Sequence, residues 1–211
     1  MAETETQPIV ATTPVTLAER TEASARSKIR RHAERSVPDQ VEAILRAGRV
    51  AHVAYAIDGQ PYLLPFTYHY EDGRLYLHGA PASRSIKALR AGSPVAVEIT
   101  LLDGLIASRE AQSHSMNYRG VVVFGRAELV ADLAEKRAAL ERMTLRYFPD
   151  RQAGRDYTPA PDKHLRAVDL LVVAIDEVSA KSRTGGPRGP QDSDEHAFGS
   201  AFVVPLPGMD V

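Results

Sequence analysis

The sequence predicts a mainly β protein in which short antiparallel strands close into a small barrel, accompanied by two or three helices. Apolar and polar residues alternate over several short stretches, which is the period of half-buried strands. Asp-Gly pairs at 58–59 and 72–73 separate consecutive stretches and favour tight hairpin turns. The tally is six or seven strands, and closing them into a barrel removes exposed strand edges.

The N-terminal half is expected to contain a tail, a helix and a three-stranded meander. Residues 1–25 are rich in Thr, Glu, Ala and Pro, which predicts a disordered tail before a single domain at 26–211. A basic stretch at 23–35 is predicted to be helical, and a further helix is expected between Pro38 and Gly48. Strands are expected at 49–57, 60–70 and 74–79.

The C-terminal half continues with strands and two helices. Ser83 is expected to cap a short helix that ends before Gly92, and Asp132 with Glu135 resembles a capping box for a helix ending at Pro149. Asp103-Gly104 is predicted to turn the chain back. The expected strands are 94–102, 105–108, 120–130 and a central, Val-rich strand at 168–175, followed by a loop at 181–191.

Composition excludes several classes of protein. The 211 residues suit one domain. The 26 basic and 27 acidic residues argue against a dedicated nucleic-acid or anionic-membrane surface. There is no cysteine, which excludes disulfides, thiolate catalysis and cysteine-based zinc sites. No apolar run approaches the roughly 20 residues of a membrane helix, and no signal peptide is evident at the start. A soluble, cytoplasmic protein is therefore expected.

The familiar enzyme signatures are missing from the chain. We find no GxSxG, P-loop or GxGxxG sequence. The seven histidines form no HExxH or other tight ligand pair, so no metal site is expected. His52 and His69 lie in predicted strands and are expected to be hydrogen-bonded structural residues.

The segment 75–85 is the most informative for chemistry. A strand ends at His78-Gly79, and a short loop then leads to Ser83 and Arg84 at a helix start. Hydroxyls, backbone N–H groups and a guanidinium converging there would suit a phosphate monoester. The alternative is an ordinary serine-capped helix with a solvated arginine.

Two further polar segments flank predicted strands. Asn117, Tyr118 and Arg119 precede the strand at 120–130 and suit a flavin ring edge or a phosphate oxygen, with a polar hairpin loop as the alternative. Lys181 and Arg183 stand beside two glycines and suit an anion, with a loop of solvated charges as the alternative.

Taken together, these segments resemble the pyridoxamine 5′-phosphate oxidase-like flavoprotein superfamily, in its branch of nitroimidazole resistance proteins. The resemblance runs from about Arg31 to Leu206 and rests on the order and spacing of several short stretches. They are residues 31–35, 51–54, 60–65, 75–84, 115–119, 123–127 and 180–185.

The resemblance implies a six-stranded Greek-key split β-barrel and a homodimer with one FMN in each of two grooves between subunits. It places the isoalloxazine beside Leu64, Pro65, Phe66, Thr67 and Tyr68. It assigns the phosphate to His78, Gly79, Ser83 and Arg84. By the same resemblance, the partner subunit contributes Asn117, Tyr118 and Arg119, and Lys181 with Arg183 closes the site.

The resemblance implies an FMN-dependent oxidoreductase acting on a small molecule such as a nitro compound or a quinone. The chain has no tryptophan and no C-terminal Arg-Leu-type signature of the true oxidases, so vitamin B6 phosphate is not the expected substrate. Two alternatives stay open. One is a non-catalytic flavin protein for storage or sensing, and the other is a related barrel that uses haem or a deazaflavin. Haem would be favoured by His78 or His114 as an axial ligand.

Overall fold

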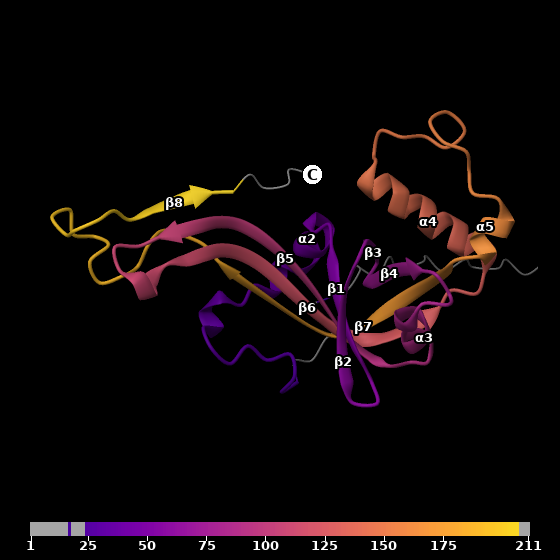
Figure 1. The fold of residues 1–211 in the computed structure, drawn as a ribbon, viewed down its shortest axis with the longest axis horizontal. Helices are drawn as coiled ribbons and strands as arrows, with labels where there is room; N and C mark the ends of the chain where they lie inside the picture. The colour runs from indigo at the N-terminus through magenta and orange to yellow at the C-terminus, as the bar shows by residue number, and fades with distance from the viewer. Residues whose placement is uncertain (1–16, 18–23, 207–211) are drawn as a thin grey trace, which may run out of the picture.

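The computed structural model describes Leu17 and residues 24–206 and shows a mainly β fold (Figure 1). This confirms the predicted split barrel, with eight strands in the described residues where six or seven were expected. The strands are β1 (Ala51–Ile57), β2 (Gln60–Phe66), β3 (Tyr68–Glu71), β4 (Arg74–Gly79), β5 (Pro94–Ala107), β6 (Ser115–Leu129), β7 (Asp169–Arg183) and β8 (Phe202–Pro205). The α-helices are α2 (Val41–Ala47), α3 (Arg84–Arg90), α4 (Leu133–Tyr147) and α5 (Asp162–Arg166), and single 3-10 turns are η1 (Ala33–Arg35), η2 (Pro38–Gln40) and η3 (Ala111–Ser113).

The sheet joins its two outer strands through a single residue. The strand order is β2-β1-β5-β6-β7-β4-β3, with β8 added to β5, and every pairing is antiparallel. The end strands β2 and β3 are consecutive in the chain and are separated only by Thr67. One predicted strand at 60–70 therefore bends from one edge of the sheet to the other, which accounts for part of the higher strand count.

Two of the predicted hairpin turns form as expected. Asp58 and Gly59 have φ values of 50° and 82°, and Asp72 and Gly73 have φ values of 48° and 76°. These left-handed pairs give the turn twist that suits a two-residue hairpin.

The prediction of a turn at Asp103-Gly104 is wrong. β5 continues through these residues to Ala107, and the pairing with β6 shifts by a bulge between Leu102 and Gly104. Arg119 of β6 holds Asp103 with two hydrogen bonds, from Nε at 3.0 Å and from Nη2 at 2.7 Å. The pairing extends β5, β6 and β8 into a long arm that reaches away from the barrel (Figure 1).

The core has a main cluster and a smaller second one. Side chains from β1, β3, β4, β5, β6 and β7 fill the main cluster, including the fully buried Tyr68 and Leu77. The second cluster lies under α4 and contains Tyr76, Ala139 and Met143. As predicted, the Asp132 side chain caps α4 by accepting a hydrogen bond from the Glu135 N–H at 2.7 Å.

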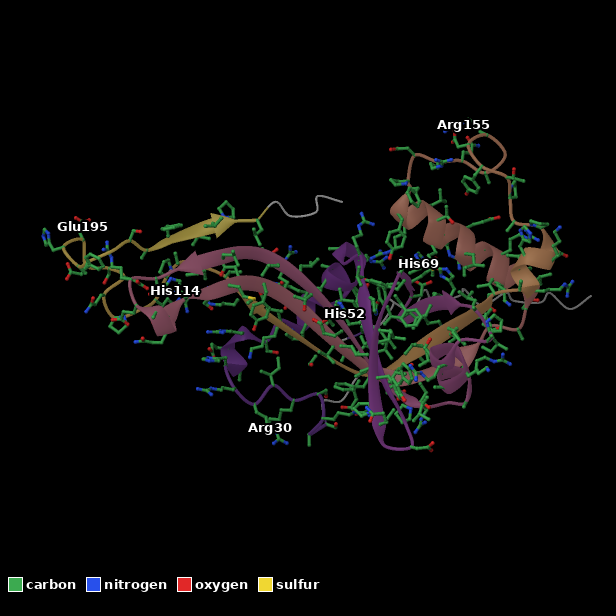
Figure 2. All side chains as sticks on the ribbon, in the orientation of Figure 1. Arg30, His52, His69, His114, Arg155 and Glu195 are labelled. Carbon is green, nitrogen blue, oxygen red and sulfur yellow. The ribbon has the colours of Figure 1, made fainter. Side chains whose placement is uncertain are left out.

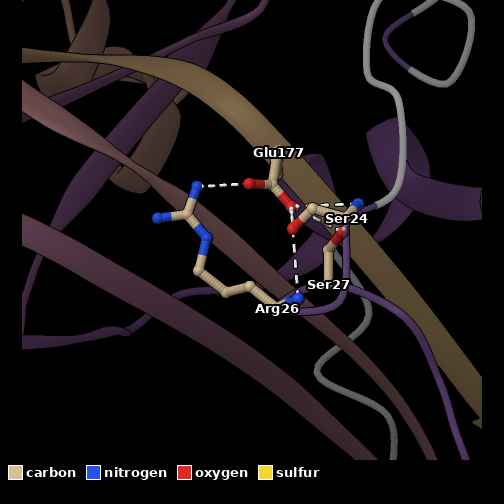
Figure 3. Close-up of polar contacts among 4 residues, drawn as sticks. All are labelled: Ser24, Arg26, Ser27 and Glu177. Atoms are coloured by element: carbon tan, nitrogen blue, oxygen red, sulfur yellow. Dashed lines mark hydrogen bonds and ion pairs between the residues drawn. The ribbon is translucent and has the colours of Figure 1, made fainter.

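The segment 24–36, called the strap here, is not the predicted helix. It is mostly irregular, with η1 as its only helical turn among the described residues. Glu177 of β7 anchors it by accepting hydrogen bonds from the Ser24 hydroxyl at 2.5 Å and the Ser27 hydroxyl at 2.8 Å, while Arg26 forms an ion pair with the same carboxylate (Figure 3). These contacts lower the pKa of Glu177 to about 2.

Most of the predicted tail at 1–25 lies outside the described residues. Leu17, which is described, is 5% exposed and belongs to the main core cluster. None of the helices that the structure describes is long and apolar enough to cross a membrane.

Candidate functional site

The first helix after β4 presents two unpaired cations on one side. Ser83 caps α3 by accepting a hydrogen bond from the Ile86 N–H at 3.3 Å, as predicted. Arg84 and Lys87 are exposed and stand three residues apart, which places them on one helix face. Within the described residues neither forms an ion pair. We call Arg84, Lys87 and the cavity beside them the α3 site.

The α3 site has a cavity of about 620 Å³ between the end of β1 and α3. Its lining includes Asp58, Arg84, Lys87 and Ser93. Arg84 also lies over the ring of Tyr62 on β2, with its guanidinium carbon 4.4 Å from the ring centroid. The site residue that sequence reasoning missed is Lys87, although its spacing of three from Arg84 was available as a signal.

The residues predicted to lie beside a flavin ring divide between the sheet edge and the core. Leu64 and Pro65 are exposed on β2, Phe66 is partly buried and Thr67 is exposed at the bend. Tyr68 is fully buried, and its hydroxyl donates to the Leu45 carbonyl oxygen at 2.6 Å. The structure therefore leaves four of these five side chains accessible and uses Tyr68 in the core.

His78 and Gly79 are predicted to join Ser83 and Arg84 at the phosphate. In the structure, Gly79 lies against α3, whereas His78 faces α4 on the other side of the strand. Gly79 packs so closely on α3 that an added Cβ would lie 2.8 Å from an Ile86 side-chain carbon. His78 lines a different cavity, of about 330 Å³, under α4. Its Nδ1 is 3.1 Å from the Met143 sulfur, and burial lowers its pKa.

The third group of predicted residues gathers where β6 begins and β7 ends. Arg183 is buried, and its Nη1 donates to the Asn117 side-chain oxygen at 2.7 Å. Burial, with Arg35 and Arg188 nearby, lowers the pKa of Arg183, and Tyr118 acts on it in the opposite sense.

Two other members of this group have structural contacts. The Lys181 ammonium donates to the Arg31 carbonyl oxygen at 2.9 Å, so it holds the strap. Arg119 is ion-paired with Asp103, which raises its pKa.

One of the two strand histidines differs from its predicted structural role. His52 Nδ1 lies 3.3 Å from a Glu98 carboxylate oxygen. The prediction that His69 is hydrogen-bonded is wrong, because both of its ring nitrogens are buried without a hydrogen-bond partner. His69 lies on β3 near α4, whereas His114 lies at the far end of the arm (Figure 2). A cavity of about 380 Å³ beside His69 is lined by arginines, and sequence reasoning did not find it.

Known proteins share this fold and much of this sequence. No curated protein matches the chain significantly. The solved flavocytochrome Anf3 from Azotobacter vinelandii is 33% identical, with 87% of this chain and 85% of that chain covered and a TM-score of 0.76. The FAD and haem binding protein from Mycobacterium smegmatis is 34% identical, with 80% and 81% covered and a TM-score of 0.72.

A third solved structure and a family profile agree with these two. A candidate 5-nitroimidazole antibiotic resistance protein from Bacteroides thetaiotaomicron is 26% identical, with 68% of this chain and 82% of that chain covered and a TM-score of 0.57. The family profile described as pyridoxamine 5′-phosphate oxidase matches residues 38–182, which is more than half of the chain. The resemblance seen in the sequence is thereby confirmed, and the chain belongs to the pyridoxamine 5′-phosphate oxidase family.

Proposed function

We propose that this protein binds a flavin nucleotide with its phosphate at the α3 site, and that the flavin is FMN, as the sequence predicts. The observation that carries the proposal is the pair of unpaired cations, Arg84 and Lys87, on the wall of one large cavity. A guanidinium and an ammonium on one helix turn suit a phosphate, which accepts several charge-assisted hydrogen bonds. The Mycobacterium smegmatis relative, which is described as an FAD and haem binding protein, supports a flavin as the cofactor.

The proposed reaction class is oxidoreduction of a small molecule, such as a nitro compound or a quinone. A bound flavin supplies the hydride and electron transfer, and the protein supplies position and electrostatics. In this chain, Arg84 and Lys87 would neutralise the phosphate charge. The exposed side chains of β2, among them Leu64 and Pro65, would offer an apolar surface to a ring system. A non-catalytic flavin carrier is the outcome if the loaded protein fails to oxidise NADH or NADPH.

We also propose that the protein is a homodimer. The arm exposes several large apolar side chains, which is typical of a surface that another protein covers. They include Leu102, Leu105, Met116, Phe202 and Val204, between 40% and 50% exposed. Light scattering on a sizing column should give twice the 23.0 kDa chain mass. A monomer at micromolar concentration would contradict the dimer and, with it, any site shared between subunits.

Haem binding is a second candidate function, alongside the flavin. The two relatives named above with more than 30% identity are described as a flavocytochrome and as an FAD and haem binding protein. Of the two predicted axial ligands, His114 is exposed and lies 3.2 Å from two backbone carbonyl oxygens. His78 faces an apolar cavity and is held in its neutral, metal-binding form by burial. His69, with two unpartnered nitrogens, fits an iron ligand as well.

The test is an absorption spectrum of the freshly purified protein, followed by heat release of any chromophore. Flavin bands with FMN in the supernatant would support the central proposal, and FAD would keep the flavin but correct its form. A Soret band would add haem. A colourless protein that takes up neither added FMN nor added FAD would contradict flavin binding.

A further inference from the structure

Unsatisfied polar atoms concentrate around β3, between α2 and α4. Seven buried side-chain nitrogen or oxygen atoms of the described residues have no hydrogen-bond partner, and five of them belong to residues lining one cavity. These five are both ring nitrogens of His69, the Tyr70 hydroxyl oxygen and the Nε atoms of Arg142 and Arg146. Because native proteins satisfy nearly all such groups, this concentration is typical of a site where a ligand would supply the partners. We call the cavity of about 380 Å³ the His69 pocket.

The His69 pocket has an excess of positive charge. Arg46, Arg49, Arg142 and Arg146 line it. Against these four guanidinium groups stand two carboxylates. Arg142 Nε lies 2.8 Å from a Glu71 oxygen, although not in hydrogen-bonding geometry, and Arg46 Nη2 lies 3.5 Å from a Glu42 oxygen. Uncompensated guanidinium groups around a cavity attract an anion, and their planar forks match carboxylates.

Two of the arginines are already engaged by the fold. Arg146 donates to the carbonyl oxygens of Leu45 and Gly48 and stacks over the Tyr68 ring at 4.6 Å. Arg49 donates to the Arg146 carbonyl oxygen at 2.7 Å. Arg46 and Arg142 pair with the carboxylates of Glu42 and Glu71, but their side chains are 57% and 37% exposed, so these two arginines can turn toward a ligand.

His69 is placed to contact the same ligand. Its side chain is only 14% exposed, and its nearest carboxylate, Glu71, is 3.8 Å from Nε2. Burial is the main cause that lowers the pKa of His69, with help from Arg142, Arg146 and Arg46, while Glu71 acts in the opposite sense. The imidazole is therefore neutral near pH 7 and keeps a lone pair for a metal or a donor.

We propose that the His69 pocket binds a dicarboxylate ligand, with the carboxylates on Arg46 and Arg142 and the body of the ligand against His69. Two sources supply this chemistry. One is haem, which has two propionates and an iron that accepts an imidazole, and this source rests on the second candidate function above. The other is a free dicarboxylic acid.

The experiment titrates three probes into the purified full chain. Haemin binding is followed by its Soret band, iron-free protoporphyrin IX by its fluorescence, and succinate by the thermal midpoint. In the double variant Arg46→Gln/Arg142→Gln, the dissociation constant of each probe that binds should rise about tenfold or more, since each charged hydrogen bond is lost. Arg142→Lys, which keeps the charge, should recover part of that loss.

A histidine variant separates the two roles in the pocket. His69→Ala should shift the Soret band of bound haemin while leaving the affinity for protoporphyrin IX nearly unchanged. The matched control for the arginine variants is Arg137→Gln, since Arg137 lies on α4 with Arg142 but pairs with Asp162 of α5. All variants are first checked for native circular dichroism, so that loss of folding is not mistaken for loss of binding.

The outcomes distinguish the pocket from the haem function. Succinate binding that is lost in the double variant, with no haemin binding, supports the pocket and rejects haem. Haemin binding that none of these variants changes leaves haem in place elsewhere, for example at His78, and overturns the pocket. Failure of all three probes to bind the wild-type chain overturns the pocket as well.

Discussion

The α3 site and the His69 pocket are both rich in cations, yet they are built in opposite ways. The α3 site takes Arg84 and Lys87 from one helix turn, beside a Ser83 cap that is already satisfied. The His69 pocket takes side chains from α2, β3 and α4, and it leaves buried polar atoms without partners. The two cations of the α3 site are brought together by their own helix alone, whereas the groups of the His69 pocket meet only when separate elements pack. Substitutions should therefore affect the two regions independently.

The largest expected effect is on flavin affinity. Arg84→Ala/Lys87→Ala should weaken FMN binding about a hundredfold, since each charged hydrogen bond contributes roughly 1.5–3 kcal/mol and 1.4 kcal/mol is about tenfold. Flavin fluorescence quenching measures this change. Lys163→Ala on α5 removes an equivalent exposed charge away from the site and serves as the control. Unchanged FMN affinity in the double variant would contradict the assignment of the flavin phosphate to the α3 site.

Gly48→Ala should disturb the His69 pocket while sparing the α3 site. A Cβ at Gly48 would lie 2.1 Å from an Ile99 methyl carbon and 2.8 Å from the Tyr68 hydroxyl oxygen. Overpacking of this kind costs about 1–3 kcal/mol of unfolding free energy. Urea denaturation measures it, with Gly186→Ala as a control because no atom lies within 4 Å of its added Cβ. Equal unfolding free energies of the two variants would show that the chain at the end of α2 shifts to accommodate the added methyl group without loss of stability.

Tyr147→Phe tests how α4 is fixed over β3. The Tyr147 hydroxyl oxygen accepts from the Tyr68 N–H at 2.9 Å and donates to the Arg49 carbonyl oxygen at 2.7 Å. Its loss leaves a half-buried N–H unpaired, so we expect about 1–2 kcal/mol lower unfolding free energy. Tyr157→Phe is the control, because the Tyr157 hydroxyl makes no such bond to any residue that the structure describes. A variant as stable as the wild type would mean that apolar packing alone docks α4.

The smallest expected effect concerns the strap. Glu177, which anchors the strap, lines neither the α3 site nor the His69 pocket. The pKa of Glu177 is lowered to about 2, first by the Ser24 hydroxyl and then by Ser27. Its stabilising contribution is thus fully present above the ordinary carboxyl value near 4.5 and is lost as the pH falls toward 2. Carbon-13 titration of the carboxyl should give a midpoint well below 4.5, moving upward in Ser24→Ala. A normal midpoint in the wild type would show that the strap is not held there.

Local sequence signals predicted most of the framework, and tertiary pairing explains where they failed. The Asp-Gly hairpins at 58–59 and 72–73 formed because nothing competes with their turn geometry. The same dipeptide at 103–104 did not turn, because β6 and β8 pair on both sides of it and Arg119 holds Asp103. The helical expectation for 23–35 failed because Glu177, far away in sequence, holds that segment from β7.

The same distinction holds for the candidate sites. Ser83 and Arg84 could be predicted since a cap and its neighbour are read from adjacent residues, and Lys87 was within reach by helical spacing. His69 could not be interpreted correctly, because the arginines that surround it come from α2 and α4. Until those helices are packed, nothing distinguishes this histidine from an ordinary strand residue.

β2 combines its position at the end of the sheet with two prolines, and this limits how copies of the chain can associate. No strand pairs with its outer side in the described residues. Pro61 and Pro65 have no N–H, so this edge offers fewer backbone donors to a further strand than an edge without proline. Growth of the sheet by edge-to-edge addition is thus discouraged, even though Leu63 is 63% exposed there. A partner at this edge would depend more on side-chain contacts, which favours a closed assembly over an open fibre.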